Sequence, residues 1–136
     1  MPSPSTRKAA PKRKSPAKAS PAPSDSPSSP FLRFHHSEAL RKKTLSVLAS
    51  VEKARDASEH RDDLADLVVE LTKCGLEAYF MAPLKASGAG FIVQQSASLG
   101  LAGAMQIMGS AIRTVVGRMD APQLLSVSGS IRQFMR

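Results

Sequence analysis

The chain has 136 residues, a formal net charge of +8 and a single cysteine. Eight of its ten prolines lie in residues 1–30, whereas no glycine precedes Gly75, so the composition changes near residue 30. Residues 31–136 are enough for one domain with one hydrophobic core, and this length argues against a multidomain enzyme.

The cysteine and aromatic contents restrict the class of protein further. One cysteine, Cys74, excludes an intramolecular disulfide framework and a cysteine zinc cluster, and it predicts a reducing, cytoplasmic location. That location would be the nucleoid in a bacterium and the nucleus in a eukaryote. No apolar segment follows the basic N-terminus, so we expect no secretory signal. With 4% aromatic residues, the chain has little with which to stack unpaired bases.

Residues 1–30 are predicted to be a disordered basic tail made mainly of Pro, Ser, Ala and Lys. They show no apolar periodicity, and proline favours extended backbone. One acid, Asp25, opposes six basic residues, which gives this segment a charge of +5. A flexible cationic chain binds polyanions by releasing counterions, with little sequence discrimination. The predicted nucleic-acid contacts are Arg7, Lys8, Lys12, Arg13, Lys14 and Lys18.

In composition the tail resembles the arms of histone H1-type linker proteins and of some bacterial nucleoid-associated proteins. Ser15-Pro16-Ala17-Lys18 has the form of the S-P-x-K repeat of such arms. The resemblance implies binding to DNA without sequence preference. A solubilising linker with no partner is the alternative, and Pro11-Lys12-Arg13-Lys14 also suits part of a nuclear localisation signal.

The first helix is predicted to begin at Ser29-Pro30 or at Ser37, since serine accepts hydrogen bonds from the exposed amides of a helix start. Its apolar positions recur at helical spacing and predict one buried stripe. The stripe consists of Leu40, Thr44, Val47, Leu48 and Val51.

The next helix is predicted to run from its cap, Asp56, to Gly75, where a left-handed residue would end it. Residues 56–77 carry a charge of −5, and this acidic helix is expected either to lie beside the basic first helix or to bind the basic tail. A short helix follows and is expected to end or kink at Pro83, before a turn over residues 87–90.

Residues 91–118 are predicted to be helical and are apolar around most of the helix circumference. The uncharged stretch 86–112 contains three glutamines and several serines, and it is expected not to span a membrane. A central core helix is the first interpretation; a self-association seam and a lipid-facing helix are the alternatives. The seam would consist of small residues on one face: Ser96, Gly100, Gly103, Ala111 and Thr114. Because interior glycines weaken a helix, the sequence does not decide whether this segment forms one helix or two.

A last helix is predicted from the cap Asp120, with Pro122 in its first turn. Its apolar stripe is predicted to consist of Leu124, Val127, Ser128, Ile131 and Phe134 or Met135. No stretch alternates as a strand would. The sequence therefore predicts an all-α fold, in which a small bundle of four to five helices over residues 31–136 follows a disordered tail over residues 1–30.

No catalytic, metal or cofactor site is predicted. The acids Asp62, Asp66 and Glu70 share one helix face, and a solvated acidic face is favoured over a cation site. The glycine-rich segment 87–90 lacks the Lys-Ser/Thr of a phosphate-binding loop, and no G-x-S-x-G signature occurs. Cys74 lies near a helix C-terminus, where the dipole disfavours a thiolate. We therefore expect no enzymatic activity and infer no small-molecule substrate.

The sequence predicts a non-enzymatic binding protein whose basic tail engages DNA or another polyanion while the helical body packs or forms a homo-oligomer. An auxiliary basic patch would consist of Arg41, Lys42 and Lys43. The alternative is a helical protein on a membrane or storage-granule surface, motivated by residues 91–118 and six methionines. Phasins, which cover polyester granules, are small helical proteins of similar character, although no motif is matched. An adaptor that docks a protein partner is the third hypothesis.

Overall fold

The computed structural model describes residues 34–135, and the regular elements in this range are all helical, which confirms the all-α prediction. The predicted tail, residues 1–30, lies outside the described residues. The elements are α1 (Glu38–Lys53), the 3-10 helix η1 (Ala57–His60), α2 (Arg61–Leu76), the π-helix η2 (Glu77–Met81), α3 (Ala82–Ala86), α4 (Phe91–Gly117) and α5 (Ala121–Phe134).

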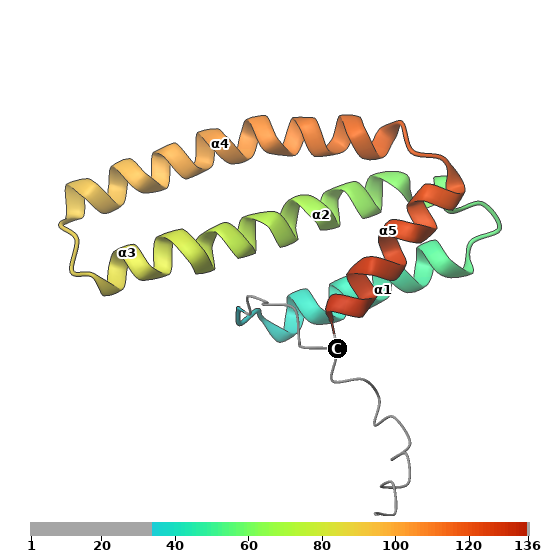
Figure 1. The fold of residues 1–136 in the computed structure, drawn as a ribbon, viewed down its shortest axis with the longest axis horizontal. Coiled ribbons are helices and arrows are strands. Elements are labelled where there is room, and N and C mark those ends of the chain that lie inside the picture. Colours follow the sequence, from blue (N-terminus) through green and yellow to red (C-terminus); the bar gives the residue numbers. More distant parts are fainter. Residues whose placement is uncertain (1–33, 136) are drawn as a thin grey trace, which may run out of the picture. The chain divides into compact units, whose positions relative to one another are not determined.

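A long antiparallel hairpin dominates the arrangement of residues 34–135 (Figure 1). Its first arm is α2, η2 and α3, which follow one another without a break, and its second arm is α4. The shorter helices α1 and α5 pack against the end of the hairpin that is far from the turn at residues 87–90. We call this end the proximal half of the hairpin and the end near the turn its distal half.

Side-chain caps fix three helix starts where the sequence predicted them. Ser37 accepts a hydrogen bond from the amide of Leu40 at 3.0 Å, which starts α1. Asp56 caps the short η1 through the amide of Ser58, so α2 itself begins later than predicted, at Arg61. Asp120 and Gln123 form a complete capping box at the start of α5, in which side chains satisfy otherwise free amides.

Gly75 does not end the second helix, so that prediction was wrong. The backbone continues through η2, in which the amide of Ala82 bonds to the carbonyl of Glu77. A wider π turn just before Pro83 accommodates a residue without an amide hydrogen. At Gly75 the ring of Phe34 would lie 3.8 Å from a Cβ, so the glycine is placed against an aromatic side chain instead. Gly88, with a φ of 74°, makes the left-handed turn.

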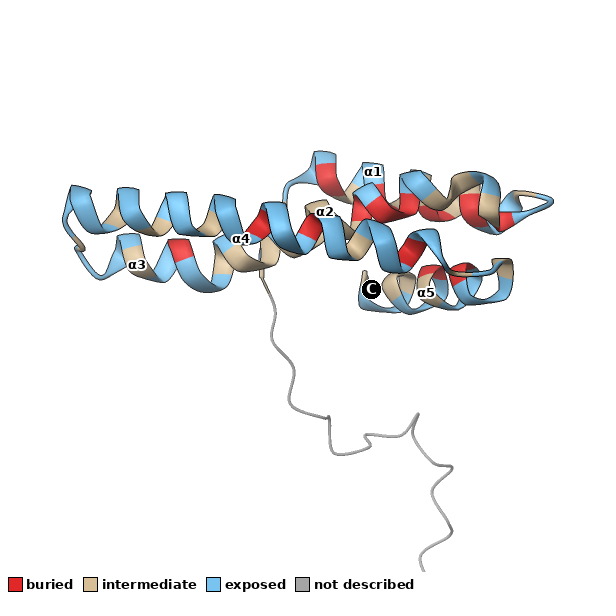
Figure 2. Ribbon diagram, turned by 90° about the horizontal axis from the view of Figure 1, so that it is seen from above, coloured by how far each residue is buried: buried red, intermediate tan, exposed pale blue. Residues whose placement is uncertain are grey.

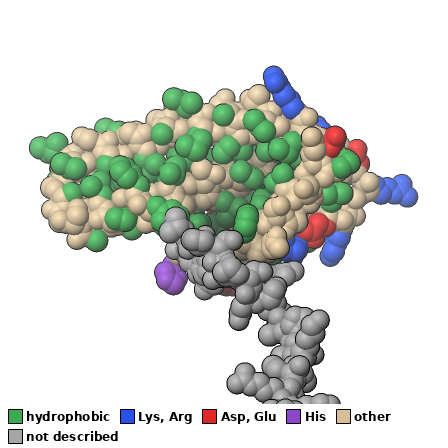
Figure 3. Space-filling model, viewed as in Figure 1, with side chains coloured by type: hydrophobic (Ala, Val, Ile, Leu, Met, Phe, Trp, Pro, Cys, Tyr) green, Lys and Arg blue, Asp and Glu red, His purple; other side chains and the backbone are tan. Residues whose placement is uncertain are grey.

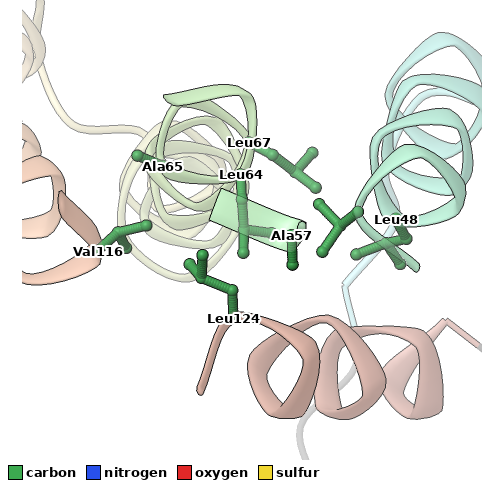
Figure 4. Packing of buried hydrophobic residues seen from close by; sticks show 8 residues of the cluster. Leu48, Ala57, Leu64, Ala65, Leu67, Val116 and Leu124 are labelled. Atoms are coloured by element: carbon green, nitrogen blue, oxygen red, sulfur yellow. The ribbon is translucent and has the colours of Figure 1, made fainter. Parts of the chain in front are cut away.

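The hydrophobic core lies in the proximal half, where α1, η1, α2 and α5 meet α4 (Figure 4). Four of the five residues in the predicted stripe of α1 are buried and Val47 is partly buried, and Leu64 and Leu67 of α2 belong to the same core. From the other side, α5 contributes Leu124 and α4 contributes Val116. Burying each large side chain stabilises the fold by about 1.5–3 kcal/mol.

The predicted core position of α4 is wrong. One unbroken helix forms over 91–117, but only 17% of its most apolar window is buried. Three of its residues, Met105, Gly109 and Val116, are fully buried. The physical reason is that α1 and α5 cover the proximal side of α2, whereas α4 packs mainly on α2 and η2. Buried residues accordingly gather in the proximal half, and exposed ones follow α4 along its length (Figure 2).

Ion pairs link the helices at the surface of the proximal half. Arg132 of α5 holds Glu52 of α1 through two hydrogen bonds of 2.8 and 2.9 Å. Lys43 of α1 pairs with Glu70 of α2, as expected for a basic first helix beside an acidic second one.

Gly109 and Gly103 of α4 provide a matched test of this packing. A Cβ at position 109 would lie 3.5 Å from Val69 of α2, whereas a Cβ at 103 meets nothing within 4 Å. We expect Gly109→Leu to destabilise the fold by about 1–3 kcal/mol through overpacking. Gly103→Leu should leave stability unchanged or raise it by up to about 1 kcal/mol, since leucine favours a helix. Denaturant unfolding measures both, and equal losses would contradict the placement of α4.

The Glu52–Arg132 pair predicts a pH dependence of stability. The hydrogen bond from Arg132 holds the pKa of the Glu52 carboxyl below its ordinary value, against the opposing effect of burial. A lowered pKa in the folded state adds stability above the unfolded pKa, and this stability is lost as the pH falls through the folded pKa. Because both side chains are about one-third exposed, we expect Glu52→Gln to cost about 0.5–1 kcal/mol at neutral pH.

The free energy of unfolding of the wild type and of Glu52→Gln should therefore converge below the ordinary pKa range of glutamate. A difference that stays constant across that range would mean that the ion pair does not carry the effect. Glu59→Gln, an exposed acid with no ion-pair partner among residues 34–135, is the matched control.

Candidate functional site

The most distinctive surface of residues 34–135 is the exposed apolar side of the hairpin. Hydrophobic side chains are spread over the face of the hairpin seen in Figure 3, and charged ones gather at its proximal end. The exposed large side chains of η2 and α4 are Tyr79, Phe80, Phe91, Ile92, Val93, Leu99, Ile107, Met108 and Val115. Single exposed hydrophobic residues are ordinary on a protein surface, whereas a contiguous patch of them marks a binding surface. The number of these exposed side chains is therefore the significant observation.

Helix α4 explains why this surface is apolar. No charged residue occurs between Ala86 and Ile112, and Arg113 pairs with Asp66 of α2 at 2.9 Å. Within residues 34–135, α4 is the one helix long and apolar enough to cross a membrane, by length and composition alone. A core helix would meet the same criterion, but α4 is mostly exposed. Its apolar composition is therefore not explained by packing within the described part of the chain.

The distal half of the hairpin carries several large exposed side chains, although the most exposed one, Phe134 at 82%, lies in α5. Phe91 and Ile92, in the first turn of α4, are 77% and 78% exposed. On the opposite arm, η2 exposes Phe80 and half-exposes Tyr79, whose ring meets that of Phe34 edge to face, with centroids 5.6 Å apart. The structure thus exposes Phe91 and Ile92 on one arm of the hairpin, and Phe80 beside the Tyr79–Phe34 pair on the other.

The structure leaves the predicted self-association residues on the surface of α4. Ser96, Gly100, Gly103, Ala111 and Thr114 are all exposed, and nothing lies within 4 Å of a Cβ built at either glycine. The close approach between helices inside the body uses a different glycine, Gly109, against Val69. The role of the five residues in self-association stays a prediction.

The predicted basic patch on α1 is divided among internal contacts. Arg41 donates a hydrogen bond of 2.9 Å to the carbonyl of Met135, and Lys43 is paired with Glu70. Lys42 is exposed and has no ion-pair partner among residues 34–135. The six basic residues of the tail lie outside the described residues, so their binding to DNA also stays a prediction.

The acidic and thiol groups of α2 show no arrangement for chemistry. Asp66 pairs with Arg113, Asp63 lies 3.1 Å from the His60 ring, and no three such groups in the described range could hold a metal ion. Burial raises the pKa of the Cys74 thiol, and the charges of Glu77 and Glu70 raise it further. A raised pKa disfavours the reactive thiolate.

No known protein family, curated protein or solved structure matches the chain. The exposed hairpin is thus the feature from which function is argued. The sequence contained one signal of it, the uncharged stretch 86–112 in a predicted helix that is apolar around most of its circumference. Buried and exposed helices share that signal. The structure distinguishes between them, because it packs α4 mainly on one neighbour, α2.

Proposed function

We propose that the protein is a non-enzymatic binding protein that attaches to a lipid membrane or storage-granule surface through the distal half of its hairpin. The observation that supports this proposal is the exposure of Phe91, Ile92 and Phe80 beside residues 91–112 of α4, which carry no charge. Transferring each such side chain from water into an apolar phase is favourable by up to about 1.5–3 kcal/mol.

The distribution of charge supports an attached orientation in which the proximal half stays in water. From Leu71 to Ile112 the charged residues are Lys73, Glu77 and Lys85, whereas acids and bases are dense in α1 and the first half of α2. Lysine side chains extend toward a polar interface while their stems remain on apolar surface. On an anionic surface, the +5 tail would add attraction of about 1 kcal/mol per basic residue close to it.

The test compares two double variants in vesicle flotation at high salt, with uncharged phosphatidylcholine vesicles. Phe91→Ser with Ile92→Ser removes apolar side chains of the distal half, and we expect it to weaken binding by about 10- to 100-fold. Leu125→Ser with Phe134→Ser removes two exposed hydrophobic residues of α5, and we expect it to bind as the wild type does. If the wild type does not float, or if both variants lose binding equally, the proposed surface attachment is wrong.

The second candidate function is binding of DNA or another polyanion by the tail, and the charge of +5 over residues 1–30 favours it. Six basic residues would neutralise about four to six phosphates and give salt-sensitive, non-specific affinity. Oligomerisation of the body would strengthen this binding by raising the effective concentration of tails.

Replacing the six predicted contacts of the tail by glutamine in the full-length chain tests this second candidate. We expect the substitution to abolish a gel shift of double-stranded DNA at low salt and to flatten its salt dependence. Lys42→Gln serves as the control on the body and should change the shift little. An unchanged shift in the glutamine variant would refute the role of the tail. A wild type that binds neither DNA nor vesicles would favour the protein-docking adaptor.

A further inference from the structure

One ridge of α4 alternates large and small side chains on the exposed side of the helix. Leu99, Gly103, Ile107 and Ala111 follow one another at four-residue spacing, so they form one i±4 row of the helix surface. Leu99 and Ile107 are 69% and 76% exposed, and Gly103 and Ala111 are also exposed. We call these four residues the α4 ridge.

The α4 ridge is complementary in shape to the α4 ridge of a second copy that runs in the opposite direction. If a second α4 lies antiparallel with Ile107 level with the partner's Gly103, then Leu99 is level with the partner's Ala111. Each large side chain then faces a small one, as ridge-into-groove packing requires. A parallel, in-register pair would instead place Leu99 against Leu99 and leave a gap between the two Gly103 residues.

The surface onto which this register would place the partner's leucine is close to flat and belongs to α4 alone. It is formed by Ile107, Ala111, Thr114 and Val115, together with Gln106 and Ser110. Ala111 forms a low point between the larger neighbours, and it is the residue that would stand level with Leu99 of the second copy. The same register places Ser96 beside Thr114 of the partner, so the small residues extend the fit on both sides.

Charge and area are consistent with a second copy as the occupant. No charged residue lies between 86 and 112, so pairing two α4 helices requires no desolvation of an ionised group over that length. In this register residues 93–117 of the two helices overlap, so a length of about 37 Å and a width of 10–12 Å bury on the order of 800 Å² in total. That value lies below the roughly 1,000 Å² of a specific interface and corresponds to a weak dimer.

Gly103 provides a further reason to expect a second copy against the α4 ridge. An interior glycine weakens a helix relative to alanine, and a Cβ at 103 would have open space around it within the body. The described fold therefore gives no reason for a glycine there, whereas a facing Ile107 of a second copy does.

We propose that two copies of the chain pair through the α4 ridge in an antiparallel, two-fold symmetric dimer, with Leu99 of each copy seated over Ala111 of the other. The proposal does not depend on lipid binding. In this register Phe91 and Ile92 stand level with Met119 and Arg118 of the second copy, which follow the end of its α4.

Single-cysteine variants in a Cys74→Ser background distinguish the arrangements. In the antiparallel pair, position 99 of one copy lies 12 residues, or about 18 Å along the helix axis, from position 99 of the other copy. The same separation holds between the two positions 111, so Leu99→Cys or Ala111→Cys alone brings no two cysteines together. Neither variant alone should form a disulfide-linked dimer, but an equal mixture of the two, with one carrying a mass tag, should form the mixed dimer. Ala102→Cys, exposed on another side of α4, should not cross-link with Ala111→Cys.

Sedimentation equilibrium of the full chain without lipid provides the second measurement. The wild type should dimerise with increasing concentration, and Gly103→Leu should lose at least about tenfold in dimer affinity while keeping its helical content. Its vesicle flotation should not change, which separates failure of this proposal from failure of the proposed function. Homodimer cross-links in the single variants, or a wild type that stays monomeric, would overturn the proposed dimer.

Discussion

The packing of α4 on α2 at Gly109 is the contact on which the rest of the structure depends. A Cβ there would lie 3.5 Å from Val69, so the glycine lets the two helix backbones approach closely. Met105 and Val116 extend the contact along one narrow side of α4. Because α1 and α5 occupy the other side of α2, this contact holds most of α4 in place and leaves most of its circumference exposed.

Two regions of different chemistry result from that arrangement. The proximal half contains the leucine core and the ion pairs Glu52–Arg132, Lys43–Glu70 and Asp66–Arg113, which are the features of a soluble helical bundle. The distal half consists of two helical arms with few charges and with large exposed apolar side chains on both arms. The proposed lipid contact uses the first turn of α4 in the distal half, whereas the α4 ridge of the proposed dimer extends from Leu99 to Ala111, into the proximal half.

Local sequence signals predicted the helices that form the core, because caps and apolar stripes report nearest-neighbour geometry. Ser37, Asp120 and the stripe of α1 lie where the sequence placed them. The prediction that the helix ends at Gly75 was wrong, because the glycine instead lies against an aromatic ring. At Pro83 a π turn lets the helix continue past a proline. The exposure of α4 was not predictable from composition, since it depends on how many helices cover it. The basic residues of α1 were predicted as a patch without knowledge of their partners Glu70 and Met135.

The exposure of α4 can be measured directly by chemical labelling of dilute, lipid-free protein. In the Cys74→Ser background, Met105→Cys would lie on the buried side of α4 and Ile107→Cys on the exposed side. The structure predicts that a hydrophilic maleimide modifies position 107 at close to the rate of an unfolded chain and position 105 at least about tenfold more slowly. Equal protection of the two positions in the monomer would contradict the account, because it would place α4 inside the core after all.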